Sequence, residues 1–192
     1  MSEQPTVLTD AAAWREWLDT HEATSDGIWL MLAKKGTVSP TSLTYAQALD
    51  EALCSGWIDG QKRSHDEATF VERFTPRRAR SMWSMRNVEH VARLIDQGRM
   101  RPRGQQEIDG AKSDGRWERA YAGSATVAVP DDLAAALRAS PAARASFDAL
   151  NSQGRYSVLH PLITAPNEVA RARRLQKVMD RLSGGPDADG DQ

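Results

Sequence analysis

The strand-like patterns of this sequence are confined to one stretch, and no other feature constrains the fold as strongly. The apolar run from Ile28 to Ala33, which follows Gly27, has the length of a buried strand. Two further short strands are predicted at 57–61 and 68–74, paired as an antiparallel hairpin with a polar loop at 61–67 between them. The second strand is predicted to end at Thr75-Pro76, because proline has no N–H for further pairing. From Ser84 onward, the apolar residues follow the helical period.

Helices are predicted where a capping residue precedes an apolar stripe. Thr9 can cap a helix that runs to about Thr20, and Thr44 with Gln47 forms a capping box before the next helix. Ser84 can cap a third helix, which ends at Gly98. That helix is predicted to bury Val88, Val91, Ala92 and Ile95. Later helices are predicted from Pro102 or Gly104, from Pro130 (burying Leu133 and Leu137), from Pro141 (burying Ala145, Phe147 and Leu150), over 155–164 with a kink or break at Pro161, and from Asn167 to Leu182.

These patterns predict an α+β fold: a small antiparallel sheet with helices in the N-terminal part, followed by an all-helical C-terminal part. The expected organisation is an α+β core domain at 1–119 with an arginine-rich segment, a helical appendage at 120–182 and a disordered acidic tail at 183–192. The single cysteine excludes an internal disulfide. No export signal or membrane-spanning run is visible, so a cytoplasmic location is expected.

Charge is unevenly distributed along the 192 residues, although the net charge is only -1. Residues 1–61 carry a net charge of -6, residues 62–119 carry +5 and residues 120–192 carry zero. The most basic stretch is 73–103, with nine arginines, no lysine and a net charge of +7. A guanidinium binds carboxylate or phosphate in a forked geometry and also stacks on aromatic rings. The stretch therefore indicates either an anion-binding face or ion pairs with the acidic first third of the chain.

Several short runs occur in an order that is typical of one protein family. They are Ser42–Tyr45, Glu51–Gln61, Arg73–Arg78, Trp83–Asn87, Gly98–Met100, Ala111–Lys112, Asp114–Trp117 and, in the last predicted helix, Arg171–Arg174. Together they resemble the YdeI/OmpD-associated family, also called the bacteriocin-protection family, over roughly 14–121 and again in that last helix. The resemblance implies a small soluble bacterial protein that is linked by name to antimicrobial-peptide or stress protection.

The candidate site combines tryptophans and arginines from the middle of the chain. On a strand, Trp57 and Asp59 share one face, and a buried Asp needs a partner. Arg73 and Arg77 are candidate partners, either in a structural ion pair or in an anion site. The predicted ligand-binding residues are Trp57, Asp59, Arg73, Arg77, Arg78, Trp83, Ser84 and Asn87. In this prediction the helix start at Ser84 and the arginines hold a phosphate or carboxylate, and the two indoles form stacking walls.

Other chemistry finds little support in the sequence. The four histidines lack metal-ligand spacing, and no phosphate-binding loop, dinucleotide fingerprint or nucleophile elbow occurs, so no metal and no cofactor is predicted. Three hypotheses remain. The first is a cytoplasmic protection protein that binds a small-molecule or peptide ligand without catalysis. The second is nucleic-acid binding through the 73–103 stretch. The third is an enzyme on an anionic small molecule that uses Asp59 and an arginine. The sequence does not specify an oligomeric state, and no membrane partner is expected.

Overall fold

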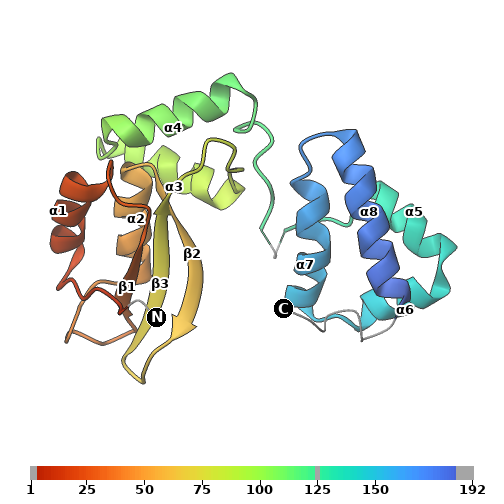
Figure 1. Cartoon of the computed structure of the whole chain (residues 1–192), viewed down its shortest axis with the longest axis horizontal. Helices are drawn as coiled ribbons and strands as arrows, with labels where there is room; N and C mark the ends of the chain where they lie inside the picture. The colour runs from red at the N-terminus through yellow and green to blue at the C-terminus, as the bar shows by residue number, and fades with distance from the viewer. Residues whose placement is uncertain (1–3, 124–125, 185–192) are drawn as a thin grey trace. The chain divides into compact units, whose positions relative to one another are not determined.

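The computed structural model describes residues 4–123 and 126–184, and the chain divides into two compact units, Met1–Ala120 (unit 1) and Tyr121–Gln192 (unit 2). The elements of unit 1 are α1 (Ala11–His21), β1 (Ile28–Ala33), α2 (Tyr45–Cys54), β2 (Trp57–Ser64), β3 (Thr69–Pro76), α3 (Met85–Asp96) and α4 (Pro102–Ser113) (Figure 1). Unit 2 contains α5 (Asp131–Ala139), α6 (Pro141–Ala149), α7 (Ser152–Ile163) and α8 (Glu168–Ser183). The α+β class, with its strands confined to the first half of the chain, is confirmed.

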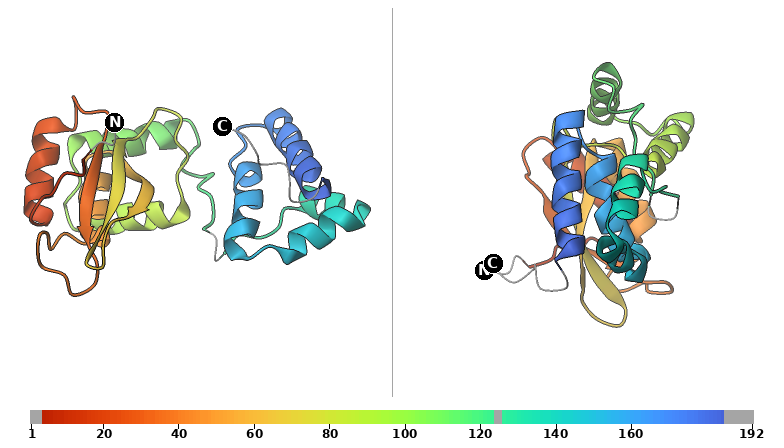
Figure 2. Two further views of the ribbon diagram at one scale, coloured as in Figure 1. Left: turned by 60° about the horizontal axis from the view of Figure 1, so that its bottom comes forward. Right: turned by 90° about the vertical axis from the view of Figure 1, so that its right-hand side faces the viewer.

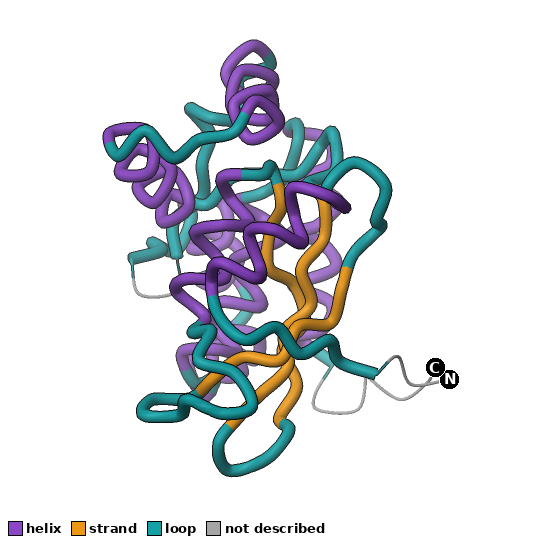
Figure 3. Tube along the Cα trace, turned by 90° about the vertical axis from the view of Figure 1, so that its left-hand side faces the viewer, coloured by secondary structure: helices purple, strands orange, loops and turns teal. Residues whose placement is uncertain are grey.

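The three strands form an antiparallel sheet in the order β1-β3-β2 (Figure 1), and Figure 3 shows the sheet in orange. Side chains alternate between its two faces, so β1 directs Ile28, Leu30 and Leu32 into one apolar cluster. Phe70 and Phe74 of β3 lie in the same cluster. These side chains pack against α1 and α2, and the indole Nε1 of the buried Trp14 donates a hydrogen bond to the Ala48 carbonyl oxygen, 3.0 Å away.

Helix α2 separates two apolar clusters. Ala48 and Ala52 face the sheet, whereas Leu49 and Leu53 pack against residues of α3 and α4. That second cluster contains Leu49, Leu53, Cys54, Trp83, Val91, Leu94, Ile108 and Ala111. Helix α2 is therefore buried on two sides, and the loops that carry the candidate site connect elements fixed to it.

Several local predictions are confirmed by the structure and others are wrong. The capping box of Thr44 and Gln47 and the caps at Ser84 and Asn167 are present. The first helix begins one residue later than predicted, because Asp10 instead of Thr9 accepts the hydrogen bond from the Ala13 N–H. The strand predicted at 57–61 continues to Ser64, so the polar loop predicted at 61–67 is shorter.

The longer β2 has a physical reason. A register shift between Asp59 and Lys62 lets the polar residues 62–64 continue the ladder with β3. Three burial predictions also fail: Ala92 is exposed, Ile95 is 42% exposed while Leu94 is buried, and α6 buries Ala143 instead of Ala145.

Unit 2 has its own core. Helix α8 contacts α5, α6 and α7. Figure 2 shows these helices from two further directions. The buried residues of this core include Leu133, Leu137, Phe147 and Leu162. Pro161 lies inside α7 without ending it, contrary to a break at this position. The predicted acidic tail lies, from residue 185 on, outside the described residues, and no described helix is long and apolar enough to cross a membrane.

Candidate functional site

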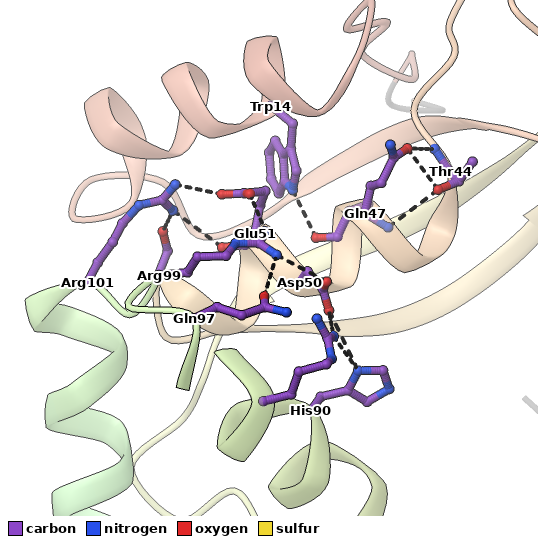
Figure 4. Close-up of polar contacts among 12 residues, drawn as sticks. Trp14, Thr44, Gln47, Asp50, Glu51, His90, Gln97, Arg99 and Arg101 are labelled. Atoms are coloured by element: carbon purple, nitrogen blue, oxygen red, sulfur yellow. Dashed lines mark hydrogen bonds and ion pairs between the residues drawn. The ribbon is translucent and has the colours of Figure 1, made fainter. Parts of the chain in front are cut away.

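The arginine stretch divides into groups with different roles. Arg93 and Arg99 form ion pairs with Asp50 of α2, at 2.6 and 3.4 Å. Arg99 also bonds to Glu51 at 2.6 Å, and the Arg101 guanidinium bonds to the other oxygen of Glu51 at 2.8 Å (Figure 4). For these three arginines, the interpretation as ion pairs with the acidic first third of the chain is confirmed.

The three arginines at the end of β3 surround a pocket. Its volume is about 340 Å³, and its lining residues are Asp26, Arg73, Thr75, Pro76, Arg77 and Arg78. Three arginines and one aspartate line it, so the lining carries a net charge of +2. Three of the eight predicted site residues therefore meet at one place, which we call the arginine pocket.

The arginine pocket is held in shape by its surroundings. The Arg77 guanidinium carbon lies 3.6 Å from the centroid of the Trp83 ring, and Arg77 is only 6% exposed. On the other side, Gly27 lies so close to β3 that a Cβ atom there would lie 2.8 Å from Thr75 Cγ2 and 2.9 Å from the Phe74 carbonyl oxygen. Gly27 also has a φ of 141°, which favours glycine.

The loop after the arginine pocket is braced by hydrogen bonds. The Arg78 N–H donates to the Ser81 hydroxyl at 3.2 Å, and the Ser81 N–H donates to the Arg78 carbonyl at 2.8 Å. Arg116 donates to the Ser81 carbonyl at 2.8 Å. Ser84 then caps α3 by accepting from the Asn87 N–H, so these two predicted site residues have a helix-capping role here.

The two predicted tryptophan walls do not line the arginine pocket. Trp57 is 0% exposed and belongs to the core cluster beside Trp14 and Phe74. Trp83 is 1% exposed and lies beneath the Arg77 guanidinium instead of facing solvent. Burial of a large ring in a core stabilises more than an exposed position does, which accounts for both placements.

Asp59 also lies outside the arginine pocket, in a cluster on the sheet face that α2 covers. The Tyr45 hydroxyl donates to the Asp59 carboxylate at 2.7 Å. Burial and this hydrogen bond both raise the pKa of Tyr45 above its ordinary value. Glu72 of β3 is 5% exposed, and its burial, together with the Asp59 charge, raises its pKa to about 7. The Tyr45 hydroxyl therefore occupies the partner position that was predicted for an arginine.

The basic side of α8 was not predicted from the sequence. Five arginines and lysines and two acidic residues lie in Glu168–Ser183, a net charge of +3. Counting 120–192 as one block hid this excess, because the three aspartates after residue 184 cancel it. A count of net charge over each predicted helix would have shown this excess. In the described part of the chain, no group of three or more His, Cys, Asp or Glu residues is arranged to hold a metal ion.

Comparisons with known protein families match two separate parts of the chain, one in unit 1 and one in unit 2. Residues 6–107 match a family model described as "Domain of unknown function (DUF8412)". Residues 126–185 match the model described as "Bacteriocin-protection, YdeI or OmpD-Associated". No curated protein and no solved structure matches the chain.

The resemblance to the bacteriocin-protection family is thus confirmed, but the matching residues lie elsewhere than predicted. Of the runs that carried the resemblance, only Arg171–Arg174 falls within the match, and most of the others fall in the region of the first model. Residues 126–185 are similar to the bacteriocin-protection family. The first model matches more than half of the chain, so the chain belongs to the family described as "Domain of unknown function (DUF8412)".

Proposed function

We propose that this protein binds an anionic small molecule or peptide group in the arginine pocket and acts in protection without catalysing a reaction. One observation carries the proposal: Arg73, Arg77 and Arg78 line the same pocket of about 340 Å³. A carboxylate or phosphate is the chemical group that several guanidinium forks recognise best. The volume lies within the range of small-molecule sites.

The rigidity of the arginine pocket supports this proposal. Arg77 is stacked on Trp83 and mostly buried, so its orientation is largely fixed before a ligand arrives. Arg78 is exposed and can close on the ligand from the solvent side. A site that combines a fixed cation with a movable one loses less side-chain entropy on binding than two movable cations would.

The family similarity supplies the broader role. The match at 126–185 suggests a role related to bacteriocin protection. We infer that unit 1 supplies ligand binding for that role, in a cytoplasmic stress or antimicrobial-protection protein. The ligand class in this proposal is a carboxylate- or phosphate-bearing molecule or peptide.

A pair of matched variants tests the proposal. Arg78→Gln removes an exposed pocket arginine, and Arg80→Gln removes an exposed arginine of the same loop that does not line the pocket. Binding of citrate and of inorganic phosphate is measured by isothermal titration calorimetry at low salt. Loss of one charge-assisted contact should weaken binding by about 10-fold in Arg78→Gln and by less than about 2-fold in Arg80→Gln.

Two results would contradict the proposal. One is the absence of binding of either anion to the unmodified protein at millimolar concentration. The other is an equal loss of affinity in both variants, which would indicate attraction by overall charge instead of a site.

A further inference from the structure

Helix α8 borders two adjoining hollows, and both lie within unit 2. The first, about 250 Å³, is lined by Ser157, Pro161, Arg174, Lys177, Val178 and Arg181. The second, about 490 Å³, is lined by Asn167, Val169, Ala170, Arg173, Arg174 and Lys177. They adjoin, since both are lined by Arg174 and Lys177, and we call the two together the α7–α8 groove. None of its residues lines the arginine pocket.

The charges of the groove are of one sign. Among the described residues that line the two hollows there are four cations and no acidic side chain. Of these cations, Arg174 is anchored, since its guanidinium donates to the Pro161 carbonyl oxygen at 2.7 Å. Within the described chain, Arg173, Lys177 and Arg181 form no ion pair. Four cations held around a concave surface repel one another, so an anionic occupant would stabilise the arrangement.

Arg171, on the same helix, has a structural role that the groove cations lack. Arg171 forms a bidentate pair with Asp132 of α5, with distances of 2.7 and 2.8 Å, and also donates to the Leu162 carbonyl. Arg171 therefore connects three helices of unit 2. The groove cations have no such carboxylate partner among the described residues, which distinguishes them from arginines that only hold the fold.

The spacing of the cations matches an extended peptide. Arg174, Lys177 and Arg181 are three and four residues apart, so they lie on one side of α8 at axial intervals of about 4.5 and 6 Å. In an extended chain, every second side chain points the same way, at intervals of about 6.6 Å. Carboxylates at alternate residues would therefore meet successive cations.

The lining favours a peptide over a single-stranded nucleic acid. Pro161 supplies apolar contact area in the first hollow, and Val169, which is 81% exposed, supplies it in the second. The lining residues include no aromatic ring on which a base could stack. We propose that the α7–α8 groove binds an extended acidic peptide segment with carboxylates at alternate residues.

Fluorescence anisotropy with three labelled peptides tests this proposal on the full chain. The first peptide has four aspartates that alternate with Ala or Gly, the second has the same residues with the aspartates in one block, and the third has Asn for Asp. The alternating peptide should bind at least about 5-fold more tightly than the block peptide, and the Asn peptide should not bind. Affinity should fall as salt is raised, since the contacts are between charges.

Matched double variants locate the binding. Lys177→Gln with Arg181→Gln removes two groove cations, and Arg138→Gln with Arg144→Gln removes two exposed cations elsewhere in unit 2. The groove double variant should bind the alternating peptide about 10-fold or more weakly, since two charge contacts are removed. The control double variant should change the affinity for the alternating peptide by less than about 2-fold.

The chain carries aspartates at 187, 189 and 191, which could compete with the probe. Each titration is therefore repeated with these three residues changed to Asn. Absence of binding in both forms, equal affinity for the alternating and block peptides, or equal loss in the two double variants would overturn the proposal. So would a single-stranded oligonucleotide that binds more tightly than the peptide and depends on Lys177 and Arg181.

Discussion

Glu51 is a buried carboxylate whose two oxygens bond to two different arginines (Figure 4). It is 7% exposed, and Arg99 and Arg101 approach it from the segment between α3 and α4. Removal of one member of such a group leaves the other charges buried without compensation. Glu51 therefore couples α2 to a segment almost fifty residues later in the sequence, as the separations of 48 and 50 residues show.

Glu51→Gln should lower the free energy of unfolding of unit 1 by about 2–3 kcal/mol, below the full value for a buried pair because both arginines reach some solvent. Urea denaturation followed by tryptophan fluorescence measures the change. Asp96→Asn, an exposed carboxylate on α3, serves as the control and should stay within about 0.5 kcal/mol. A cost for Glu51→Gln no larger than that of the control would show that the network does not stabilise the fold.

Glu72 makes the stability of unit 1 depend on pH near neutrality. Its pKa of about 7 in the folded protein lies above its ordinary value of 4.5, so the folded state binds this proton more tightly than the unfolded state does. Stability from this group is present below pH 4.5 and is lost as the pH rises towards 7. The expected loss is about 2 kcal/mol, since one pKa unit corresponds to about 1.4 kcal/mol and solvent relaxation reduces the effect.

Glu72→Gln should remove this dependence, because an amide cannot ionise. Unfolding free energies of the variant and of the unmodified protein, measured from pH 5 to pH 8, should converge at the acidic end and separate at the alkaline end. Glu89→Gln, at an exposed position of α3, should leave the slope unchanged. Parallel pH curves for the Glu72→Gln variant and the unmodified protein would contradict the role assigned to this carboxylate.

At the scale of elements, the contact between α2 and α4 requires a residue without a side chain. A Cβ atom at Gly104 would collide with the Cys54 carbonyl oxygen, and it would lie 2.8 Å from both the carbonyl carbon and Met100 Cε. The Arg101 N–H donates to that same carbonyl oxygen at 3.1 Å. The first turn of α4 is thus placed against the last turn of α2 by backbone proximity.

Gly104→Ala should destabilise unit 1 by about 2 kcal/mol or more, because two backbones would have to separate. Gly110→Ala in the same helix is the matched control, since its nearest neighbour would be an Arg116 nitrogen at 3.9 Å. That change should stabilise by up to about 1 kcal/mol through helix propensity. Thermal unfolding of the two variants side by side measures the difference, and the same sign in both would contradict the steric explanation.

The elements that the sequence predicts well are those whose signals are local. The capping box at Thr44, the apolar run of β1 and the cap at Ser84 each involve a few neighbouring residues, and all three are observed. The extension of β2 was missed because residues 62–64 are polar and join the ladder only through their pairing with β3. Such pairing depends on a partner strand, which local composition does not report.

The candidate site shows the same limit. Arg73, Arg77 and Arg78, which the sequence analysis grouped, line one pocket because Arg73 lies in β3 and the other two follow that strand directly. The sequence did not predict that Trp57 lies in the core or that Tyr45 forms a hydrogen bond with Asp59. Those outcomes depend on how α2 packs on the sheet, which brings residues from different elements together.

At the scale of the whole chain, each unit has a hydrophobic core made of its own residues. The core of unit 2 involves α5 to α8, and its half-buried His160 has a pKa lowered by burial and by the charge of Arg174. The folded state of unit 2 thus disfavours the protonated imidazole, and its stability decreases as the pH falls below about 6.5. Glu72 gives unit 1 the opposite dependence.

Differential scanning calorimetry should therefore resolve two transitions whose midpoints move in opposite directions between pH 7.5 and pH 5. The midpoint of unit 1 should rise as the pH falls, and that of unit 2 should decrease. His160→Gln should abolish the movement of the second transition only. A single transition that responds as a whole to both changes would show that the two cores unfold as one.

The close approach of α4 to Cys54 has a consequence for chemical reactivity. Cys54 is the only cysteine in the sequence, it is 1% exposed, and burial raises the pKa of its thiol to about 11. A thiol-specific reagent at neutral pH can react only while the apolar cluster that α2 forms with α3 and α4 is open around Cys54, because both access and thiolate formation require it. The labelling rate of the unmodified chain consequently reports how often this cluster opens.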